Sequence, residues 1–123
     1  MNRYLVCAMT LGFALSSLHA VSACADTGFI DGAHVKFTMV DASGNYGGCM
    51  VLIDKNPKLT LPTCGNHWVS FSCTGTYAPK DLAYRMFDTA QLALVTNKTV
   101  TLRIEDTKLH NGYCYASRID LNQ

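Results

Sequence analysis

An excess of charge of either sign is missing from this sequence. Ten Lys and Arg side chains stand against nine Asp and Glu among 123 residues. Proteins that bind nucleic acid use clustered positive charge to neutralise phosphates, and a near-neutral chain lacks such a surface. We therefore expect no nucleic-acid partner.

The short motifs of common catalytic sites are missing as well. The sequence contains no G-x-S-x-G, no H-E-x-x-H and no phosphate-binding loop. His34, His67 and His110 share neither the i, i+4 spacing nor the neighbouring carboxylates of a metal or catalytic site. We expect a protein without enzymatic activity, cofactor or bound metal.

Long apolar runs are absent except near the N-terminus. There Arg3 precedes an apolar run from Tyr4 to Leu18, and mostly small residues occupy positions 20–23. This order predicts a secretory signal peptide over residues 1–23. The run is shorter than the roughly 20 residues of a membrane span, so we expect an exported protein, periplasmic or secreted, without a transmembrane span.

Removal of residues 1–23 would leave residues 24–123, which are 100 of the 123 residues. A chain of this length forms one domain with a modest core, and covalent cross-links help to stabilise such a core. We expect a single domain over residues 24–123.

Four cysteines inside this domain predict disulfides in an oxidising compartment. Their spacing leaves three pairings open. We favour Cys49 with Cys64 and Cys73 with Cys114, because the second bridge would tie the strand before the helix to the last strand. Each bridge would stabilise the fold by about 2–4 kcal/mol. A zinc site is the alternative, and the absence of C-x-x-C disfavours it.

Cys24 lies at the expected cleavage point and has two interpretations. The segment Val21-Ser22-Ala23-Cys24 is similar to the lipobox of bacterial lipoproteins, which predicts lipidation of Cys24 and a lipid anchor in the envelope. The alternative is ordinary signal-peptidase cleavage near the same point, which leaves a fifth cysteine in the mature chain.

One segment has the periodicity of a helix, and five have that of strands. Apolar residues recur at i, i+3, i+4 and i+7 from Pro79 to Thr96, which predicts a helix with one buried face. Pro79 suits the first helical position, and Asn97 marks a stop. Alternation and turn residues predict strands at residues 35–39, 49–53, 68–73, 99–104 and 113–121.

The remaining segments are expected to be connections between these elements. Asp26–Asp31 is expected to be a lead-in, residues 54–66 a loop, and residues 105–112 a polar connection that ends in a tight Asn-Gly turn. Five strands with a helix between the third and fourth is the element order of the OB-fold, a five-stranded barrel. We expect an α+β, mainly β domain whose helix closes one end of this barrel.

A set of residues on the helix and the following strands carries a resemblance to a known family. The set comprises Lys80, Ala83, Arg85, Met86, Asp88, Thr89, Ala93, Thr96, Val100 and Ser117-Arg118-Ile119. It resembles the central helix and closing strands of the cholera-toxin-type B subunits. The resemblance implies a secreted OB-fold that forms rings of five and binds cell-surface glycans. The tryptophan that these subunits place after the fourth strand is absent, because Glu105 and Asp106 stand there, so no binding residues carry over.

A second resemblance covers more of the mature chain. Its residues are Cys49, Cys64, Trp68, Phe71-Ser72-Cys73 and Asn111-Gly112-Tyr113-Cys114, together with the helix. This pattern is similar to small exported proteins of Gram-negative bacteria that have no assigned activity. It implies export and carries no mechanism.

Aromatic side chains are the remaining candidates for a binding role. Trp68 is the only tryptophan, and Tyr77, Tyr84, Tyr113 and Tyr115 are the tyrosines of interest. Aromatic faces stack on sugars and anchor protein interfaces. Trp68 has two interpretations: it packs beneath the proline-containing loop, or it is a ligand or subunit contact.

These patterns support an exported, non-enzymatic binding module. The leading hypothesis is an oligomeric protein that resembles the toxin B subunits and binds a glycan or protein surface. The candidate oligomer is a pentamer. The alternative is a monomeric periplasmic or lipid-anchored envelope protein with a structural role.

Overall fold

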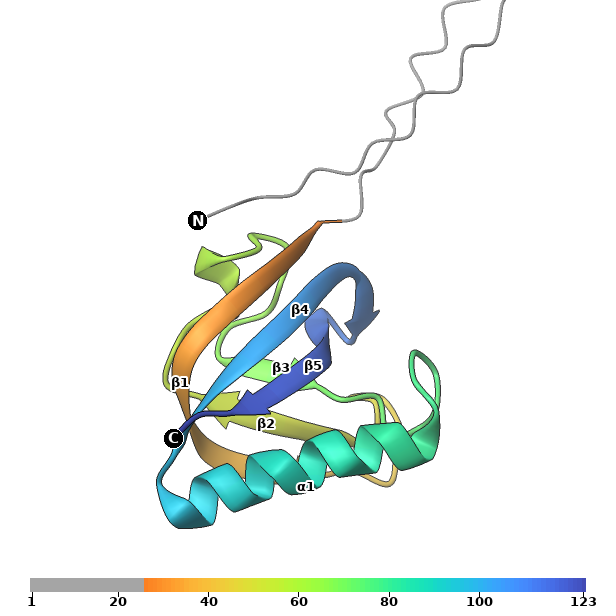
Figure 1. The fold of residues 1–123 in the computed structure, drawn as a ribbon. Helices are drawn as coiled ribbons and strands as arrows, with labels where there is room; N and C mark the ends of the chain where they lie inside the picture. Colours follow the sequence, from red (N-terminus) through yellow and green to blue (C-terminus); the bar gives the residue numbers. More distant parts are fainter. Residues whose placement is uncertain (1–25) are drawn as a thin grey trace, which may run out of the picture.

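The computed structural model describes residues 26–123, which form a mainly β structure with one α-helix (Figure 1). The expected signal peptide and Cys24 lie outside the described residues. In chain order the elements are β1 (Thr27–Val40), β2 (Cys49–Ile53), the 3-10 helix η1 (Pro57–Leu59), β3 (Trp68–Ser70), α1 (Lys80–Thr96), β4 (Thr99–His110) and β5 (Tyr113–Leu121). The predicted content of five strands and one helix is confirmed for this part of the chain.

The five strands form one closed ring in the order β1-β2-β3-β5-β4. All neighbours are antiparallel except β3 and β5, which pair in parallel where Ser70 meets Tyr115. β1 pairs with two strands: its first half pairs with β4 and its second half with β2. The register shifts between Ile30 and Ala33, where Gly32 has a φ of 63°. A bulge of this kind bends a strand, and here it lets β1 reach both partners.

Two strands are longer than the sequence predicts. β1 begins at Thr27, so Thr27–Asp31 is strand rather than part of a lead-in, and Phe29 pairs with Arg103 of β4. β4 continues to His110, which leaves only Asn111-Gly112 as the turn before β5. Apart from buried Ile30, these strand ends carry mostly polar or exposed side chains, so they lack the regular alternation by which half-buried strands are recognised.

β3 is shorter than predicted, because it ends at Ser70 instead of Cys73. Ser72 has a φ of 62°, which lies outside the extended region and turns the chain away from the sheet. The predicted loop at residues 54–66 contains η1, whose first turn is capped by the side chain of Asn56.

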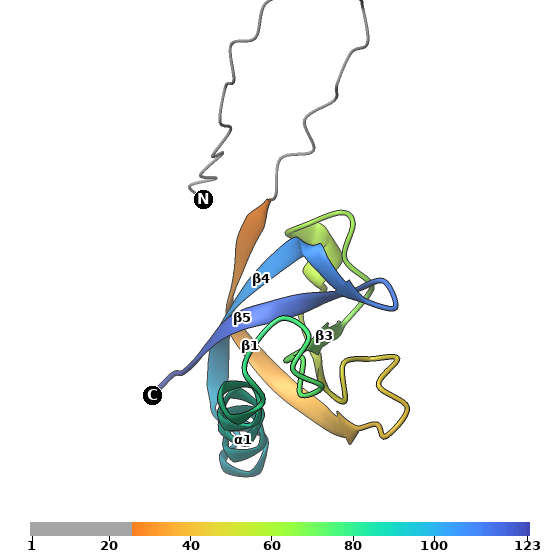
Figure 2. The same cartoon turned by 90° about the vertical axis from the view of Figure 1, so that its right-hand side faces the viewer.

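α1 agrees closely with its prediction. Pro79 is the residue before the helix rather than its first residue, and Asn97 ends the helix in the left-handed conformation with a φ of 53°. The helix lies across one end of the ring, under β1 and β5 (Figures 1 and 2). Its buried residues are Ala83, Met86, Phe87, Ala90 and Ala93.

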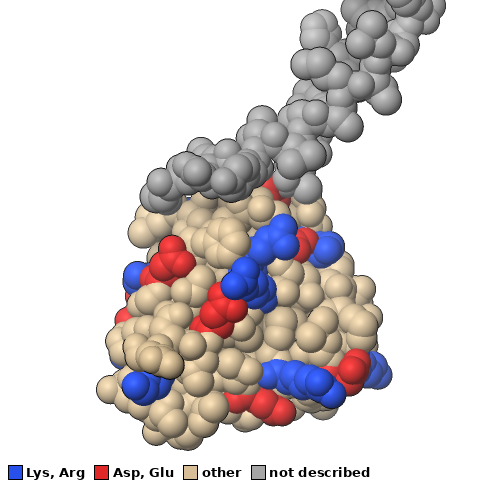
Figure 3. All heavy atoms as spheres, viewed as in Figure 1, with Lys and Arg blue, Asp and Glu red and all other residues tan. Residues whose placement is uncertain are grey.

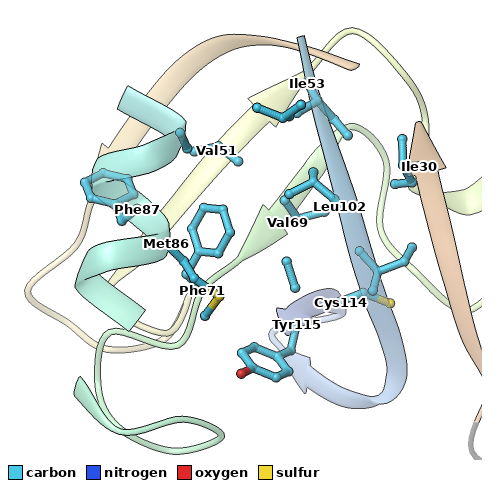
Figure 4. Close-up of a cluster of buried hydrophobic side chains, with 14 of the residues drawn as sticks. Ile30, Val51, Ile53, Val69, Phe71, Met86, Phe87, Leu102, Cys114 and Tyr115 are labelled. Atoms are coloured by element: carbon cyan, nitrogen blue, oxygen red, sulfur yellow. The ribbon is translucent and has the colours of Figure 1, made fainter. Parts of the chain in front are cut away.

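The core fills the space between α1 and the inner face of the ring (Figure 4). Phe71 and Phe87 meet edge to face with ring centroids 6.5 Å apart, which joins the helix to the chain just after β3. The labelled side chains of Figure 4 come from α1, from the five strands and, for Phe71, from the chain just after β3. No helix among residues 26–123 is long and apolar enough to cross a membrane.

Both disulfides form, but the favoured pairing is wrong. The bridges are Cys49–Cys73 and Cys64–Cys114. Phe71 N–H donates to the Cys49 carbonyl oxygen at 3.2 Å, so the chain leaving β3 runs beside the start of β2 and brings Cys73 to Cys49. The loop before β3 instead reaches the last hairpin, which places Cys64 beside Cys114.

Candidate ligand-binding site

Three aromatic side chains and two methionines line one open hollow of about 240 Å³. The lining residues are Met39, Tyr46, Met50, Trp68 and Tyr113. Trp68, the predicted ligand or interface contact, therefore shares this hollow with Tyr113. The lining has no charged side chain.

The register of the sheet determines which side chains form the floor of the hollow. Met39 of β1 lies directly opposite Met50 of β2, so their side chains share one face of the sheet. Met50 in turn lies opposite Ser70 of β3, and Trp68 stands two residues before Ser70 on the same face. The intervening residues Val51 and Val69 are fully buried in the core. The hollow therefore lies on the outer face of the ring.

Tyr46 forms one wall and comes from the turn between β1 and β2. Its carbonyl oxygen accepts a hydrogen bond from Ser70 Oγ at 3.0 Å. The next residue, Gly47, has a φ of 78°, which only glycine adopts without strain. Sequence reasoning missed Tyr46 because it stands among turn residues; the available signal was an aromatic residue directly before two glycines.

Tyr113 forms the adjoining wall, and its ring packs at a tilt against that of Tyr46, with 6.1 Å between the centroids. It is the first residue after the predicted Asn-Gly turn, and the next residue is bonded to Cys64. Gly65 N–H donates to the Gly112 carbonyl oxygen at 2.8 Å. The disulfide and this hydrogen bond fix the base of Tyr113 against the loop.

A buried polar network adjoins the turn that carries Tyr46. His110 Nε2 lies 3.0 Å from Ser72 Oγ, and that oxygen also accepts a hydrogen bond from Tyr77 N–H at 2.9 Å. Tyr77 Oη donates to the Leu109 carbonyl oxygen at 2.9 Å. Ser72 has no exposed surface and His110 is 8% exposed. Burial lowers the pKa of His110 below its ordinary value of 6.5, so its imidazole is neutral at pH 7.

A serine and a histidine at hydrogen-bond distance are the first two members of a nucleophilic triad. Here the Ser72 hydroxyl is fully enclosed, so no substrate reaches it in this conformation. The spacing of Ser72 and His110 in the sequence gave no signal for this contact. His34 and His67 do not join the network; the Nδ1 of His67 lies 3.2 Å from the Ile53 carbonyl oxygen.

The other predicted aromatic residues lie elsewhere. Tyr84 is about half exposed on α1. Tyr77 and Tyr115 pack against each other at a tilt beside the buried polar network, with centroids 5.7 Å apart. Lys108 Nζ lies 5.6 Å from the centre of the Tyr115 ring. Lys108 also pairs with Glu105, with 2.9 Å between Nζ and Oε2. None of these residues lines the hollow.

Comparisons with protein families, with characterised proteins and with solved structures found no match to this chain. Among residues 26–123, no group of three His, Cys, Asp or Glu side chains is arranged to hold a metal ion. Among the described residues, the hollow around Trp68 is the candidate binding site.

Proposed function

We propose that this protein is an exported, non-enzymatic binding module whose aromatic hollow holds a carbohydrate ring. The observation that carries the proposal is the convergence of Trp68, Tyr46 and Tyr113 on one open hollow with an uncharged lining. A pyranose ring has an apolar C–H face that stacks on an aromatic plane, while its hydroxyl groups point sideways to water. Aromatic side chains combine such an apolar face with a polar edge.

The size of the hollow supports a small unit rather than a long ligand. About 240 Å³ is below the roughly 300–1,000 Å³ of pockets that enclose drug-sized molecules. An open hollow of this size suits one terminal sugar of a larger glycan. The face drawn in Figure 3 has acidic and basic side chains interspersed, and this mixture supports a neutral ligand over nucleic acid.

We also propose that the closed ring is an OB-fold barrel. The support is the strand order, in which β5 returns to lie beside β3, together with the position of α1 between β3 and β4. The two disulfides support folding in an oxidising compartment, as export to the periplasm or beyond would provide.

Assembly into a ring of subunits is the second part of the proposal. Apolar side chains on β1 and α1 remain exposed, among them Phe37 at 64% and Val95 at 79%. Exposed apolar side chains mark a subunit contact where they gather in one patch, and these residues are the candidates for such a patch. Native mass spectrometry of the exported protein tests this part. A mass near five protomers supports the toxin-like assembly, whereas a single protomer favours the alternative of a monomeric envelope protein.

A glycan array with the exported protein tests the carbohydrate proposal. The expected result is a reproducible hit that Trp68→Ala abolishes. Tyr84→Ala is the matched control, because Tyr84 is an exposed aromatic residue outside the hollow. The absence of any hit, or a hit that survives Trp68→Ala, contradicts carbohydrate binding at this site.

A further inference from the structure

We propose that His110 is a positioning residue for the aromatic hollow, and that protonation of its imidazole displaces Tyr46 from its contact with Tyr113. The inference deepens the proposed binding function and rests on it for its biological meaning. Its decisive readout is the shape of the hollow itself, which is measured without any ligand.

A short chain of hydrogen bonds links His110 to Tyr46. His110 Nε2 lies 3.0 Å from Ser72 Oγ, and the backbone N–H of Ser72 donates to Ser70 Oγ at 3.2 Å. Ser70 Oγ then donates to the Tyr46 carbonyl oxygen at 3.0 Å. Ser70 and Ser72 are both fully buried, so water does not substitute for these bonds while the network is closed.

Direct packing provides a second link. A Cβ at residue 47 would lie 2.6 Å from His110 Cδ2 and 2.8 Å from His110 Nε2, so the imidazole lies against the backbone that follows Tyr46. Thr74 N–H holds the same residue through the Gly47 carbonyl oxygen at 3.0 Å. On its other side His110 is the cross-strand partner of Tyr113 in the last hairpin. The imidazole is thus adjacent to both walls of the hollow.

The donors and acceptors of the network assign the tautomer of His110. Ser72 Oγ accepts the Tyr77 N–H, and Nε2 of His110 is the acceptor within reach for the hydroxyl proton of Ser72. We therefore assign the neutral ring as protonated on Nδ1, with Nε2 accepting. Protonation of Nε2 removes that acceptor, leaves the Ser72 hydroxyl without a partner for its proton, and buries a positive charge. The closed network therefore favours the neutral ring.

In the described part of the chain, no acidic side chain is paired with His110 to stabilise the charged ring. Tyr77 packs on the imidazole with centroids 4.7 Å apart, Ser72 and Gly47 are neutral, and Tyr115 lies behind Tyr77. On the same strand, Lys108 and Glu105 pair with each other. Burial is the one cause that shifts the pKa of His110, and it lowers that pKa. We therefore expect the hydrogen-bond network to open only below pH 6.5.

Trp68 gives a direct readout, because it lines the hollow and is the only tryptophan. The experiment records Trp68 emission of the full exported protein from pH 7.5 to pH 4.5, with far-ultraviolet circular dichroism in parallel. The expected result is a single transition in emission below pH 6.5 while the dichroism stays native. His110→Gln should abolish the transition, since the amide oxygen accepts from Ser72 and does not titrate.

His67→Gln is the matched control, because His67 is the neighbour of Trp68 in the sequence and lies outside the network. The transition should survive this substitution. Ser72→Ala serves as a second variant if His110→Gln fails to fold, and it should shrink the transition at least twofold. The proposal is overturned by a flat wild-type emission profile, by loss of the dichroism signal together with the emission change, or by a transition that disappears in His67→Gln.

The outcomes separate this inference from the carbohydrate proposal. A flat emission profile with an intact glycan hit at pH 7.5 overturns the role of His110 alone. An emission transition without any glycan hit leaves the role of His110 standing and overturns the ligand class. If both hold, wild-type affinity for the array hit should fall about tenfold between pH 7.5 and pH 5, which is about 1.4 kcal/mol, and His110→Gln should not show this fall.

Discussion

Gly65 lies directly against the ring of Tyr113: a Cβ at residue 65 would stand 2.5 Å from Tyr113 Cδ1 and 3.2 Å from the Gly112 carbonyl oxygen. No real side chain tolerates such contacts. One wall of the hollow thus depends on the absence of a side chain in a loop that is distant in the sequence. The Cys64–Cys114 bridge holds the two segments at this separation.

Gly65→Ala should therefore move Tyr113 and destabilise the protein by about 1–3 kcal/mol, the usual cost of overpacking. Urea unfolding gives the free energy, and Trp68 emission reports the hollow. Gly112→Ala is the control, because its Cβ meets nothing within 4 Å and only its φ of 83° is strained. If both variants change the native emission equally, the packing of Gly65 does not set the position of Tyr113.

Peptide mapping without reductant should recover Cys49 linked to Cys73 and Cys64 linked to Cys114. Replacing both cysteines of either bridge by serine should lower the free energy of unfolding by about 2–5 kcal/mol. The Cys64–Cys114 pair should affect Trp68 emission more, since Tyr113 is bonded next to it. A recovered Cys49–Cys64 peptide would contradict the structure.

Stability should decline on mild acidification because of His110. Its pKa in the folded protein lies below the ordinary 6.5, so the unfolded chain binds more protons between these two values. The contribution is complete above pH 6.5 and is lost progressively as the pH falls below it, with a slope of at most about 1.4 kcal/mol per pH unit. Urea unfolding at several pH values measures this slope. It should disappear in His110→Gln and persist in His34→Gln.

The end of α1 allows a test of the backbone alone. Asn97 has a φ of 53°, and its N–H bonds to the carbonyl oxygens of the last helical turn. Asn97→Ala should destabilise the protein by about 1 kcal/mol, whereas Asn97→Gly should be neutral or slightly stabilising, because glycine adopts this conformation without strain. Thermal unfolding of the two variants compares them. The same loss in both would indicate that the Asn97 side chain, not its φ, is what matters.

The proposed anchor at Cys24 predicts a clear difference in labelling. Cells given labelled palmitate should incorporate label into the wild-type protein and not into Cys24→Ser. The control is Cys49→Ser with Cys73→Ser, which removes cysteines of the folded domain and leaves Cys24 in place. Equal labelling of wild type and Cys24→Ser rules out the anchor.

Periodicity predicted the elements that bury one face. α1, β2 and β5 were predicted with bounds that match within one residue, because their apolar side chains alternate or recur at the helical period. The first half of β1 and the last part of β4 were missed, since strand pairing there depends on backbone hydrogen bonds to a distant partner. Ser72 ends β3 early through a backbone conformation for which its residue type gives no signal.

The candidate site was predicted only in part for a related reason. Trp68 and Tyr113 were both singled out by their residue type, as aromatic side chains. Tyr46 joins them through the curvature of the ring, and the contact between His110 and Ser72 spans 38 positions. The pairing of the cysteines likewise depended on which loop meets the last hairpin. Such long-range relationships are properties of the closed ring and not of any local pattern.

The parallel contact between β3 and β5 also sets when this protein is able to fold. The ring closes where Ser70 meets Tyr115, and Tyr115 lies in the last strand. A chain emerging N-terminus first leaves the edge of β3 unpaired until nearly all of it has appeared. Pairing between distant strands is slow, and unpaired edges favour association with other chains. Closure of the ring is therefore expected to be the late, rate-determining event, and the last nine residues of strand decide whether it occurs.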